Sequence, residues 1–290
     1  MIDIHMHTVY SDGDKTVEEV LKMCEEKKLE YISITDHDTC KQYEDEALKN
    51  NKVFTGKIIK GTELHARFED KNIEILGYGI DTNIITEWTK KYYSDEKLRE
   101  QQVICYKRML EIFDKHGIIY DETKFKRPEK PTDYVEQPIY WEIIKNEKNR
   151  KILGEFAESF TLFFRKGLAN PNSSYFMNHI EFRPPYKEVI DIIHQAGGKA
   201  FLAHPFEYKF DDTMKFIDDL RKEAELDGIE CFHPSSADDD KKDILVDYAR
   251  KNNLYISGGS DYHGSPKPDL QIGVGRGNLN ISKEIIEEWI

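Results

Sequence analysis

The chain has 290 residues, a net charge of −13 and 33% charged residues. This length suits one large domain or a domain that carries an insertion, and 39% hydrophobic residues are enough for a core. The acidic balance argues against general affinity for long nucleic acids and for anionic membranes, since both attract positive charge, whereas bound cations would still allow a phosphorylated substrate.

Cysteine usage and the lack of long apolar runs indicate where the protein works. No apolar run reaches the length of a membrane span, and the N-terminus lacks the apolar core of a signal peptide. Cys24, Cys40, Cys105 and Cys231 are scattered, with no Cys-x-x-Cys spacing. We therefore expect a cytoplasmic protein with reduced thiols and no membrane partner.

Short β-like runs alternate with helical patterns at both ends of the chain. The expected strands are 1–5, 31–35, 57–61, 73–78, 199–203, 228–232 and 254–257. The expected helices are 16–28, 186–195, 212–225 and 238–252. In the first helix, Val17, Val20, Leu21 and Cys24 recur at helical spacing, and Asp14 is available as a cap. This alternation predicts parallel strands joined by helical crossovers, in either a barrel or a doubly wound sheet.

The middle of the chain breaks this alternation. The stretch is mostly helical in pattern and rich in Lys, Glu and Tyr, with a proline-punctuated loop at 128–138. A basic cluster at 124–130 is typical of a solvated loop. We predict a helical subdomain at 85–183, inserted into a metal-binding domain formed by 1–84 and 184–290.

Almost every expected strand carries a His, Asp or Glu at its end. His5 and His7 end the first strand, and Asp261 and His263 follow the last, so each pair points to one side. The other strand-associated candidates are Asp36, His37, Asp38, Glu63, Glu74, His204 and His233. The strand ends of a parallel barrel form one mouth, where nitrogen and carboxylate ligands would converge on metal. Ionised Glu63 and Asp261 close together would also need cations, so the sequence predicts a multi-metal hydrolase.

These residues stand in motifs that resemble the PHP (polymerase and histidinol phosphatase) superfamily. The likeness is to its stand-alone metal-dependent phosphoesterases, the branch with nucleoside 3′,5′-bisphosphate phosphatases and 5′→3′ exoribonucleases. The matching segments are His5-Met-His7-Thr-Val-Tyr-Ser-Asp12-Gly, Ile-Thr-Asp36-His37-Asp38-Thr, Gly61-Thr-Glu63, Leu-Gly-Tyr-Gly-Ile-Asp81, Ala-Gly-Gly-Lys-Ala-Phe-Leu-Ala-His204-Pro, Asp-Gly-Ile-Glu230 and Gly-Gly-Ser-Asp261-Tyr-His263-Gly. The resemblance implies an α/β fold, a distorted (β/α)7 barrel with an inserted helical subdomain.

The resemblance also implies three clustered divalent ions, which would be Mn, Zn or Fe. The ligands of the first ion would be His5, His7, Glu63 and Asp261. Glu63 would bridge to the second ion, which also takes His204. The ligands of the third ion would be Asp12, His37 and His263. A hydroxide bridging two ions would attack phosphorus, and the catalytic candidates are Glu63, Asp261 and His233.

One position departs from the pattern of this branch. The segment before Leu-Gly-Tyr normally begins with a His that completes the second metal site, and here that position is Glu74. Glu74 would act as an anionic ligand and favour Mn²⁺-like ions, or His65 would supply the nitrogen instead, or the second metal would be weak or lost. The Arg-x-His pattern expected in the insertion is not evident at 138–142. The candidates for substrate binding are therefore His65, Arg67, His179 and Arg183.

The leading hypothesis is a metal-dependent phosphoesterase that hydrolyses a phosphomonoester of a small substrate, such as a nucleotide 3′,5′-bisphosphate or a short RNA end. A histidinol-phosphate phosphatase is the second hypothesis. A PHP module that binds metal with reduced or no catalysis is the third.

Overall fold

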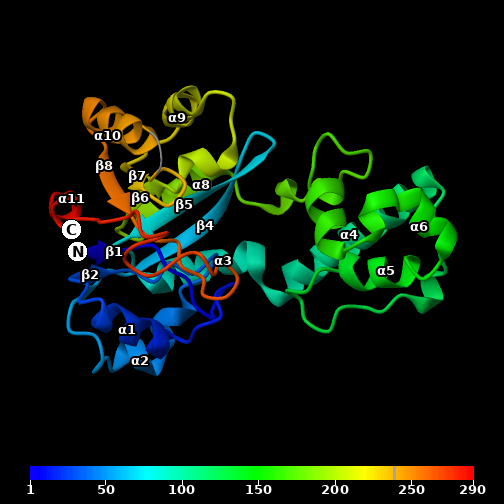
Figure 1. Ribbon diagram of the computed structural model, residues 1–290, viewed down its shortest axis with the longest axis horizontal. Helices are drawn as coiled ribbons and strands as arrows, with labels where there is room; N and C mark the ends of the chain where they lie inside the picture. Colours follow the sequence, from blue (N-terminus) through cyan, green and yellow to red (C-terminus); the bar gives the residue numbers. More distant parts are fainter. Residues whose placement is uncertain (238–239) are drawn as a thin grey trace. The chain divides into compact units, whose positions relative to one another are not determined.

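A computed structural model describes residues 1–237 and 240–290 (Figure 1). The chain divides into two compact units: an α/β unit, Met1–Thr89 with Arg183–Ile290, and a helical unit, Lys90–Phe182. The sequence placed the corresponding boundaries at 85 and 183. The first boundary in the structure lies between Thr89 and Lys90, within α3 (Thr82–Tyr93), which is one continuous helix.

The α/β unit is built on two sheets. Its described strands are β1 (Ile2–Asp3), β2 (Tyr31–Ile32), β3 (Lys57–Ile58), β4 (Gly61–Phe68), β5 (Lys71–Tyr78), β6 (Lys199–Leu202), β7 (Gly228–Phe232) and β8 (Tyr255–Gly258). The sheet with the order β1-β2-β3 is parallel, and the sheet with the order β4-β5-β6-β7-β8 is mixed. Isolated bridges pair Met6 with Tyr262 and His37 with Glu63, so the chain beyond β1 and β2 meets the second sheet.

The expectation of parallel strands is wrong for the hairpin of β4 and β5. These strands pair antiparallel over their full length, and β5 also pairs antiparallel with β6. Glu63 therefore lies inside a strand rather than at the end of one. The turn residues Glu69 and Asp70 include no glycine or asparagine to mark a tight turn, although Glu69 adopts a left-handed φ of 53°. The sequence pattern consequently gave no sign of this hairpin.

Helices accompany the sheets of the α/β unit. Besides most of α3, they are α1 (Val17–Glu26), α2 (Glu46–Lys49), α8 (Tyr186–Gln195), α9 (Thr213–Arg221), α10 (Lys241–Lys251) and α11 (Glu284–Glu287). The N-cap of α1 is Thr16, not the expected Asp14, and Thr16 forms a capping box with Glu19. Residues 238–239, with which the expected helix 238–252 begins, lie outside the described residues.

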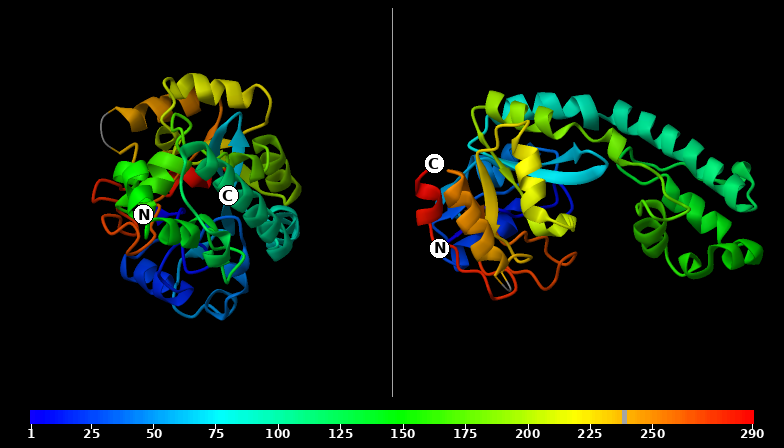
Figure 2. Two further views of the ribbon diagram at one scale, coloured as in Figure 1. Left: turned by 90° about the vertical axis from the view of Figure 1, so that its right-hand side faces the viewer. Right: turned by 90° about the horizontal axis from the view of Figure 1, so that it is seen from above.

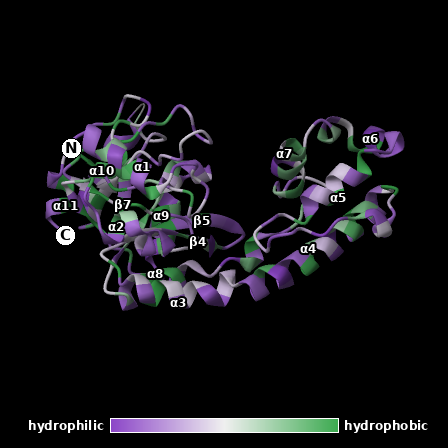
Figure 3. Ribbon diagram, turned by 90° about the horizontal axis from the view of Figure 1, so that it is seen from below, coloured by the Kyte–Doolittle hydropathy of each residue, from purple (hydrophilic) through white to green (hydrophobic). Residues whose placement is uncertain are grey.

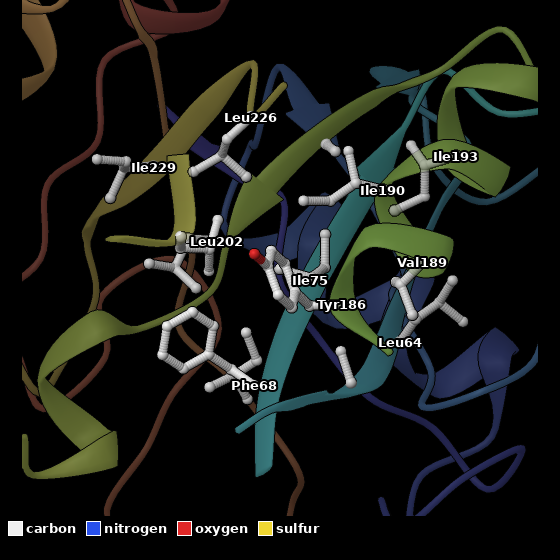
Figure 4. Close-up of a cluster of buried hydrophobic side chains, with 14 of the residues drawn as sticks. Leu64, Phe68, Ile75, Tyr186, Val189, Ile190, Ile193, Leu202, Leu226 and Ile229 are labelled. Carbon is white, nitrogen blue, oxygen red and sulfur yellow. The ribbon is translucent and has the colours of Figure 1, made fainter. Parts of the chain in front are cut away.

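The apolar face of α8 packs on the second sheet. Val189 and Ile193 of α8 lie against Leu64 of β4, Ile75 of β5 and Leu202 of β6 (Figure 4). Burying an aliphatic side chain of this size contributes about 1.5–3 kcal/mol relative to its exposed state. This cluster fixes the strands from which the polar side chains described below project.

Both ends of the chain lie in the α/β unit (Figure 2). The Ile2 amide donates to the Ile281 carbonyl at 3.0 Å. The N-terminal amine of Met1 and the Lys283 ammonium both contact the Glu30 carboxylate at 2.8 Å. The C-terminal segment is thus joined to β1 and to the residue that precedes β2.

The helical unit has an aromatic-rich core of its own. Its helices are α4 (Asp95–His116), α5 (Glu136–Ile143), α6 (Glu147–Leu153) and α7 (Phe160–Leu162), and a π-helical turn follows at Phe163–Leu168. Met109, Phe113, Tyr140 and Phe163 are fully buried. Polar and apolar residues alternate along α4 (Figure 3). Within the described residues, no helix is both long and apolar enough to cross a membrane.

Candidate metal centre

The site begins at the end of β1, where the chain stays extended and presents two buried imidazoles to one side. His5 Nε2 and His7 Nε2 lie 3.0 and 3.2 Å from Glu63 Oε2. The same nitrogens lie 3.5 and 3.4 Å from Asp261 Oδ1. One ligand atom from each of these four residues lies within 4.8 Å of the others. Two imidazoles and two carboxylates therefore face a common point.

A second group shares His7 with the first. Asp12 Oδ1 lies 3.2 Å from His263 Nε2, 3.7 Å from His7 Nδ1 and 3.9 Å from His37 Nε2. The Asp12 carboxyl is the exposed member of this group, whereas His7 and His263 are buried. The three imidazoles lower the pKa of Asp12 below its usual range, although its partial burial opposes this shift.

A third group shares Glu63 with the first. His204 Nε2 lies 2.9 Å from Glu63 Oε1 and 3.4 Å from Glu74 Oε2. His65 Nε2 lies 3.1 Å from Glu74 Oε1. The two side chains meet because β4 continues past Glu63 and places His65, on the same face as Glu63, directly opposite Glu74 of β5. Glu74 and His65 thus both lie at this end of the site, and neither is left out of it. Burial and Glu63 favour protonation of Glu74, but His65 and His204 outweigh them and lower its pKa to about 2.

Two further nitrogen-bearing side chains face Asp261. His233, which is 1% exposed, has its Nε2 3.4 Å from Asp261 Oδ2. Lys267 Nζ lies 2.5 Å from the same oxygen. The sequence predicted His233 but not Lys267, whose motif Ser265-Pro-Lys267-Pro reads as an ordinary loop.

The two arginines predicted to bind substrate lie near the β4 edge of the α/β unit. Arg183 Nη1 lies 3.3 Å from Asp38 Oδ2. The same oxygen lies 2.7 Å from His65 Nδ1, so Asp38 connects Arg183 to His65. The Arg67 backbone amide donates to the Pro184 carbonyl at 2.7 Å. His179 belongs to the helical unit and is not among the residues that the α/β unit brings together.

Carboxylates outside these groups hold the imidazoles in place. Glu230 is fully buried. Its Oε1 lies 2.8 Å from His5 Nδ1, and its Oε2 accepts from the His204 backbone amide at 2.8 Å. Asp36 accepts from the Thr8 amide and hydroxyl, both at 2.7 Å. A carboxylate on the far nitrogen of a histidine fixes its tautomer and makes it a better ligand. Glu230 ends the motif Asp-Gly-Ile-Glu230, and the sequence alone indicated no role for it.

The backbone around the site is strained. Asp38, His204 and Asp261 adopt positive φ angles of 53°, 22° and 53°. Each such non-glycine conformation costs roughly 1–3 kcal/mol, and such residues cluster at functional sites. A β-carbon on Gly259 would lie 2.4 Å from His5 Cβ, so only glycine allows the chain just after β8 to pass this close to His5.

The electrostatics of the cluster suit cations. Burial raises the pKa of Glu63, but His5 and His37 outweigh burial and hold it well below its usual range. Burial opposes the charged form of His7 and of His204, yet nearby carboxylates raise their pKa values to about 9 and about 10. The cluster thus favours ionised carboxylates and attracts positive charge, which is what a metal site requires.

Several buried ring nitrogens also have no hydrogen bond of good geometry within the described part of the chain. They are His7 Nε2, His37 Nδ1, His204 Nδ1, His233 Nε2 and His263 Nε2. Buried polar atoms are rarely left unpaired in folded proteins. Unpaired imidazole nitrogens beside ionised carboxylates are the donor set that divalent transition ions take, so these residues fit the metals that the sequence implied.

An α/β fold that gathers His and carboxylate donors into clusters that share members has the features of a metal-dependent enzyme. A comparison with protein families then gives the family: the PHP domain matches residues 3–237, and the chain belongs to that family. The resemblance inferred from the motifs is confirmed. The protein is a metal-dependent hydrolase of phosphate esters that uses divalent metal.

Relatives match this chain over most of their length. The 5′-3′ exoribonuclease Rnm of Escherichia coli K12 is 26% identical over 283 residues, covering 93% of this chain and 87% of the relative. The 5′-3′ exoribonuclease of Haemophilus influenzae is 26% identical and covers 99% of this chain and 97% of its own length. The phosphoribosyl 1,2-cyclic phosphate 1,2-diphosphodiesterase of Eggerthella lenta is 26% identical, covering 90% and 94%.

Solved structures share the fold. A candidate metal-dependent phosphoesterase from Bifidobacterium adolescentis superposes with a TM-score of 0.65 at 23% identity, covering 99% of this chain and 94% of that one. An amidohydrolase from Chromobacterium violaceum with bound sulfate and no metal gives 0.61 at 22% identity, covering 91% and 88%. These structures support the mixed α/β architecture.

Proposed function

We propose that this protein hydrolyses a phosphomonoester of a small phosphorylated substrate, a nucleotide 3′,5′-bisphosphate or the end of a short RNA. The observation that carries the proposal is the central place of Glu63, which is fully buried within 3.0 Å of both His5 and His204. One carboxylate shared between two groups of ligands would hold two cations side by side. Adjacent cations are the usual means of hydrolysing phosphate esters.

We propose three divalent ions, Mn, Zn or Fe, held by the three groups that share His7 and Glu63. When bound, such ions neutralise charge on phosphoryl oxygens and lower the pKa of water. His5, His7, Glu63 and Asp261 would hold one ion. Asp12, His37 and His263 would hold another. Glu63, His204 and Glu74, with His65 beside Glu74, would hold the third.

The remaining side chains would bind and orient the substrate. His233 and Lys267 both contact Asp261, so a phosphoryl group at this centre would meet an imidazole and an ammonium. Arg183 reaches the site through Asp38 and His65, at the edge where Arg67 also lies. We assign His233 to contact the phosphoryl group, and Arg67 and Arg183 to the binding of a further phosphate.

We also propose that strands of the two sheets close into the distorted (β/α)7 barrel implied by the family resemblance. The bridges from Met6 to Tyr262 and from His37 to Glu63 support closure, because each links one sheet to the other. Each bridge also includes or adjoins a residue of the metal centre. Barrel closure would therefore bring the ligands of both sheets to one mouth.

Charge and relatives favour a short substrate. The net charge of −13 would repel an extended nucleic acid, whereas a mononucleotide or one RNA end needs only the local field of the site. Two of the relatives carry names that describe 5′-3′ exoribonucleases. A nucleotide with phosphates on both the 3′ and 5′ carbons reproduces the chemistry of such an RNA end.

The test is phosphate release from adenosine 3′,5′-bisphosphate by Mn²⁺-loaded protein. We expect release that is lost in Asp261→Ala and retained in Asp219→Ala, a matched control on α9 whose carboxylate pairs with Lys215 and Lys222. No release by protein with bound metal would contradict this substrate. Histidinol phosphate would then be tried, and failure of both would indicate a module that binds metal without turnover.

Glu74 needs a test of its own. A Glu74→His variant exchanges an anionic ligand for a neutral one, and we expect its metal preference to move from Mn²⁺ towards Zn²⁺. Metal content by elemental analysis, measured beside the hydrolysis rate, reports this shift. A variant with unchanged metal content, preference and rate would show that Glu74 is not a ligand.

A further inference from the structure

The helical unit contains a meeting point of metal-type donors of its own. Cys105 lies on α4, Glu136 is the first residue of α5, and His179 precedes the short turn at Ile180–Phe182 (Figure 1). One ligand atom from each lies within 4.8 Å of the other two. Three segments far apart in sequence thus bring a thiol, a carboxyl and an imidazole together.

Glu136 is an unusual residue for the core in which it lies. Glu136 and Asn149 are the buried polar or charged residues among the described part of the helical unit. Asn149 has a structural explanation, since its amide exchanges hydrogen bonds of 2.7 and 2.8 Å with the Ile119 backbone. Glu136, at 1% exposure, instead faces His179 Nε2 at 2.9 Å and the Cys105 thiol.

Burying a carboxylate costs several kcal/mol unless other groups compensate for its charge. His179 is 25% exposed at its side chain and offers one contact to Glu136. The Cys105 thiol lies beside this carboxylate, and one ligand atom of each lies within 4.8 Å of the other and of His179. A divalent cation would compensate the buried charge, and a thiol that coordinates it is deprotonated outright. Thiolate and carboxylate together would match the charge of such an ion.

We propose that Cys105, Glu136 and His179 form a separate site for a divalent transition ion of the zinc class. Sulfur, nitrogen and oxygen donors together are typical of Zn²⁺, whereas the centre in the α/β unit draws on imidazoles and carboxylates. Three protein ligands leave a fourth position for water, which the partly exposed His179 side would admit. The ion would link α4, α5 and the returning segment within the helical unit.

Cobalt substitution tests this site because it reports on sulfur. A thiolate bound to Co²⁺ gives an intense near-ultraviolet charge-transfer absorption that imidazole and carboxylate ligands do not give. We expect this band in the reduced, Co²⁺-loaded full-length protein. We expect its loss in Cys105→Ala and its retention in Cys231→Ala, a control that removes another buried thiol, in the α/β unit.

Elemental analysis completes the experiment. Cys105→Ala should bind one equivalent of Co²⁺ less than the parent protein, with hydrolysis of the phosphate substrate still measurable, and His179→Gln should show the same loss of Co²⁺. His179→Gln keeps the test valid if the alanine variant folds poorly. Cobalt-loaded parent protein without the band, or a band that survives in Cys105→Ala, would overturn the proposal and leave a metal-free group of hydrogen-bonded side chains.

Discussion

The two units bury polar groups on very different scales. In the α/β unit, His5, Glu63 and Glu230 are 0% exposed and Asp261 is 3% exposed, with several more imidazoles beside them. The described core of the helical unit is almost entirely apolar and aromatic, with Glu136 as its one buried carboxylate. Burial of charge is costly, so a fold concentrates it where chemistry needs it. We therefore propose that the α/β unit carries out hydrolysis and that the helical unit mainly provides packing.

The largest expected effect is from Glu63→Gln, which removes the carboxylate shared by two ligand groups. Removing a residue that only hydrogen-bonds to a metal ligand already lowers metal affinity or activity by about 10–100-fold. Removing a ligand shared by two ions should therefore lower the rate of hydrolysis by more than about 100-fold. The measurements are the initial rate of phosphate release and the metal content. Glu18→Gln on the surface of α1, whose carboxylate pairs with Lys22, is the control. If Glu63→Gln hydrolyses the substrate as fast as the parent protein, the proposed role of the α/β unit in hydrolysis is wrong.

The matching change in the helical unit is Phe163→Ala. Phe163 is fully buried, and its ring centroid lies 5.6 Å from that of Tyr140 and 5.7 Å from that of Tyr175. Removing a buried phenyl ring costs about 3–5 kcal/mol. Denaturant unfolding should show this loss, while the metal content of the α/β unit stays unchanged under folding conditions. Loss of those metals in folded protein would show that the helical unit does more than pack.

Glu230→Gln tests how far the arrangement of the site depends on its supporting residues. The substitution keeps the shape of the side chain but removes the charge that faces His5 Nδ1 at 2.8 Å. We expect metal affinity to fall by about 10–100-fold, as for other carboxylate partners of ligating histidines. Titration against a competing chelator measures the affinity. Unchanged affinity, with the fold intact, would restrict Glu230 to holding the His204 backbone.

The residues of the centre were visible in the sequence because their types recur at the ends of β-like runs. His5 and His7 share a face by strand alternation, and the family motifs added the grouping of the rest. What the sequence could not give is contact between distant segments. Glu230 reaches His5 across 225 positions of the chain, and this contact depends on a sheet order that no local pattern encodes.

The hairpin of β4 and β5 is a part of the fold that the sequence pattern did not predict. Without a marked turn at Glu69, the pattern suggested strand ends where the structure has one long strand, and Glu63 was placed at an end. His65 consequently remained an alternative ligand rather than a neighbour of Glu74. In the helical unit, the approach of Glu136 to Cys105 had no signal at all, because neither residue stands in a motif.

The smallest predicted effects come from helix caps, which should not distinguish the two units. Thr16 caps α1 in the α/β unit, and Ser94 caps α4 in the helical unit through the Lys97 amide. Replacing either by alanine should cost about 1 kcal/mol in the free energy of unfolding. Thr16→Ala should cost more, since the Thr16 hydroxyl accepts from the Glu19 amide at 3.3 Å and donates to the Glu19 carboxylate at 2.8 Å, whereas the Ser94 hydroxyl caps through one bond, from the Lys97 amide. Denaturant unfolding of both variants measures these losses, with metal content as the control, and a loss well above about 1 kcal/mol in either variant would show that its cap does more than begin its helix.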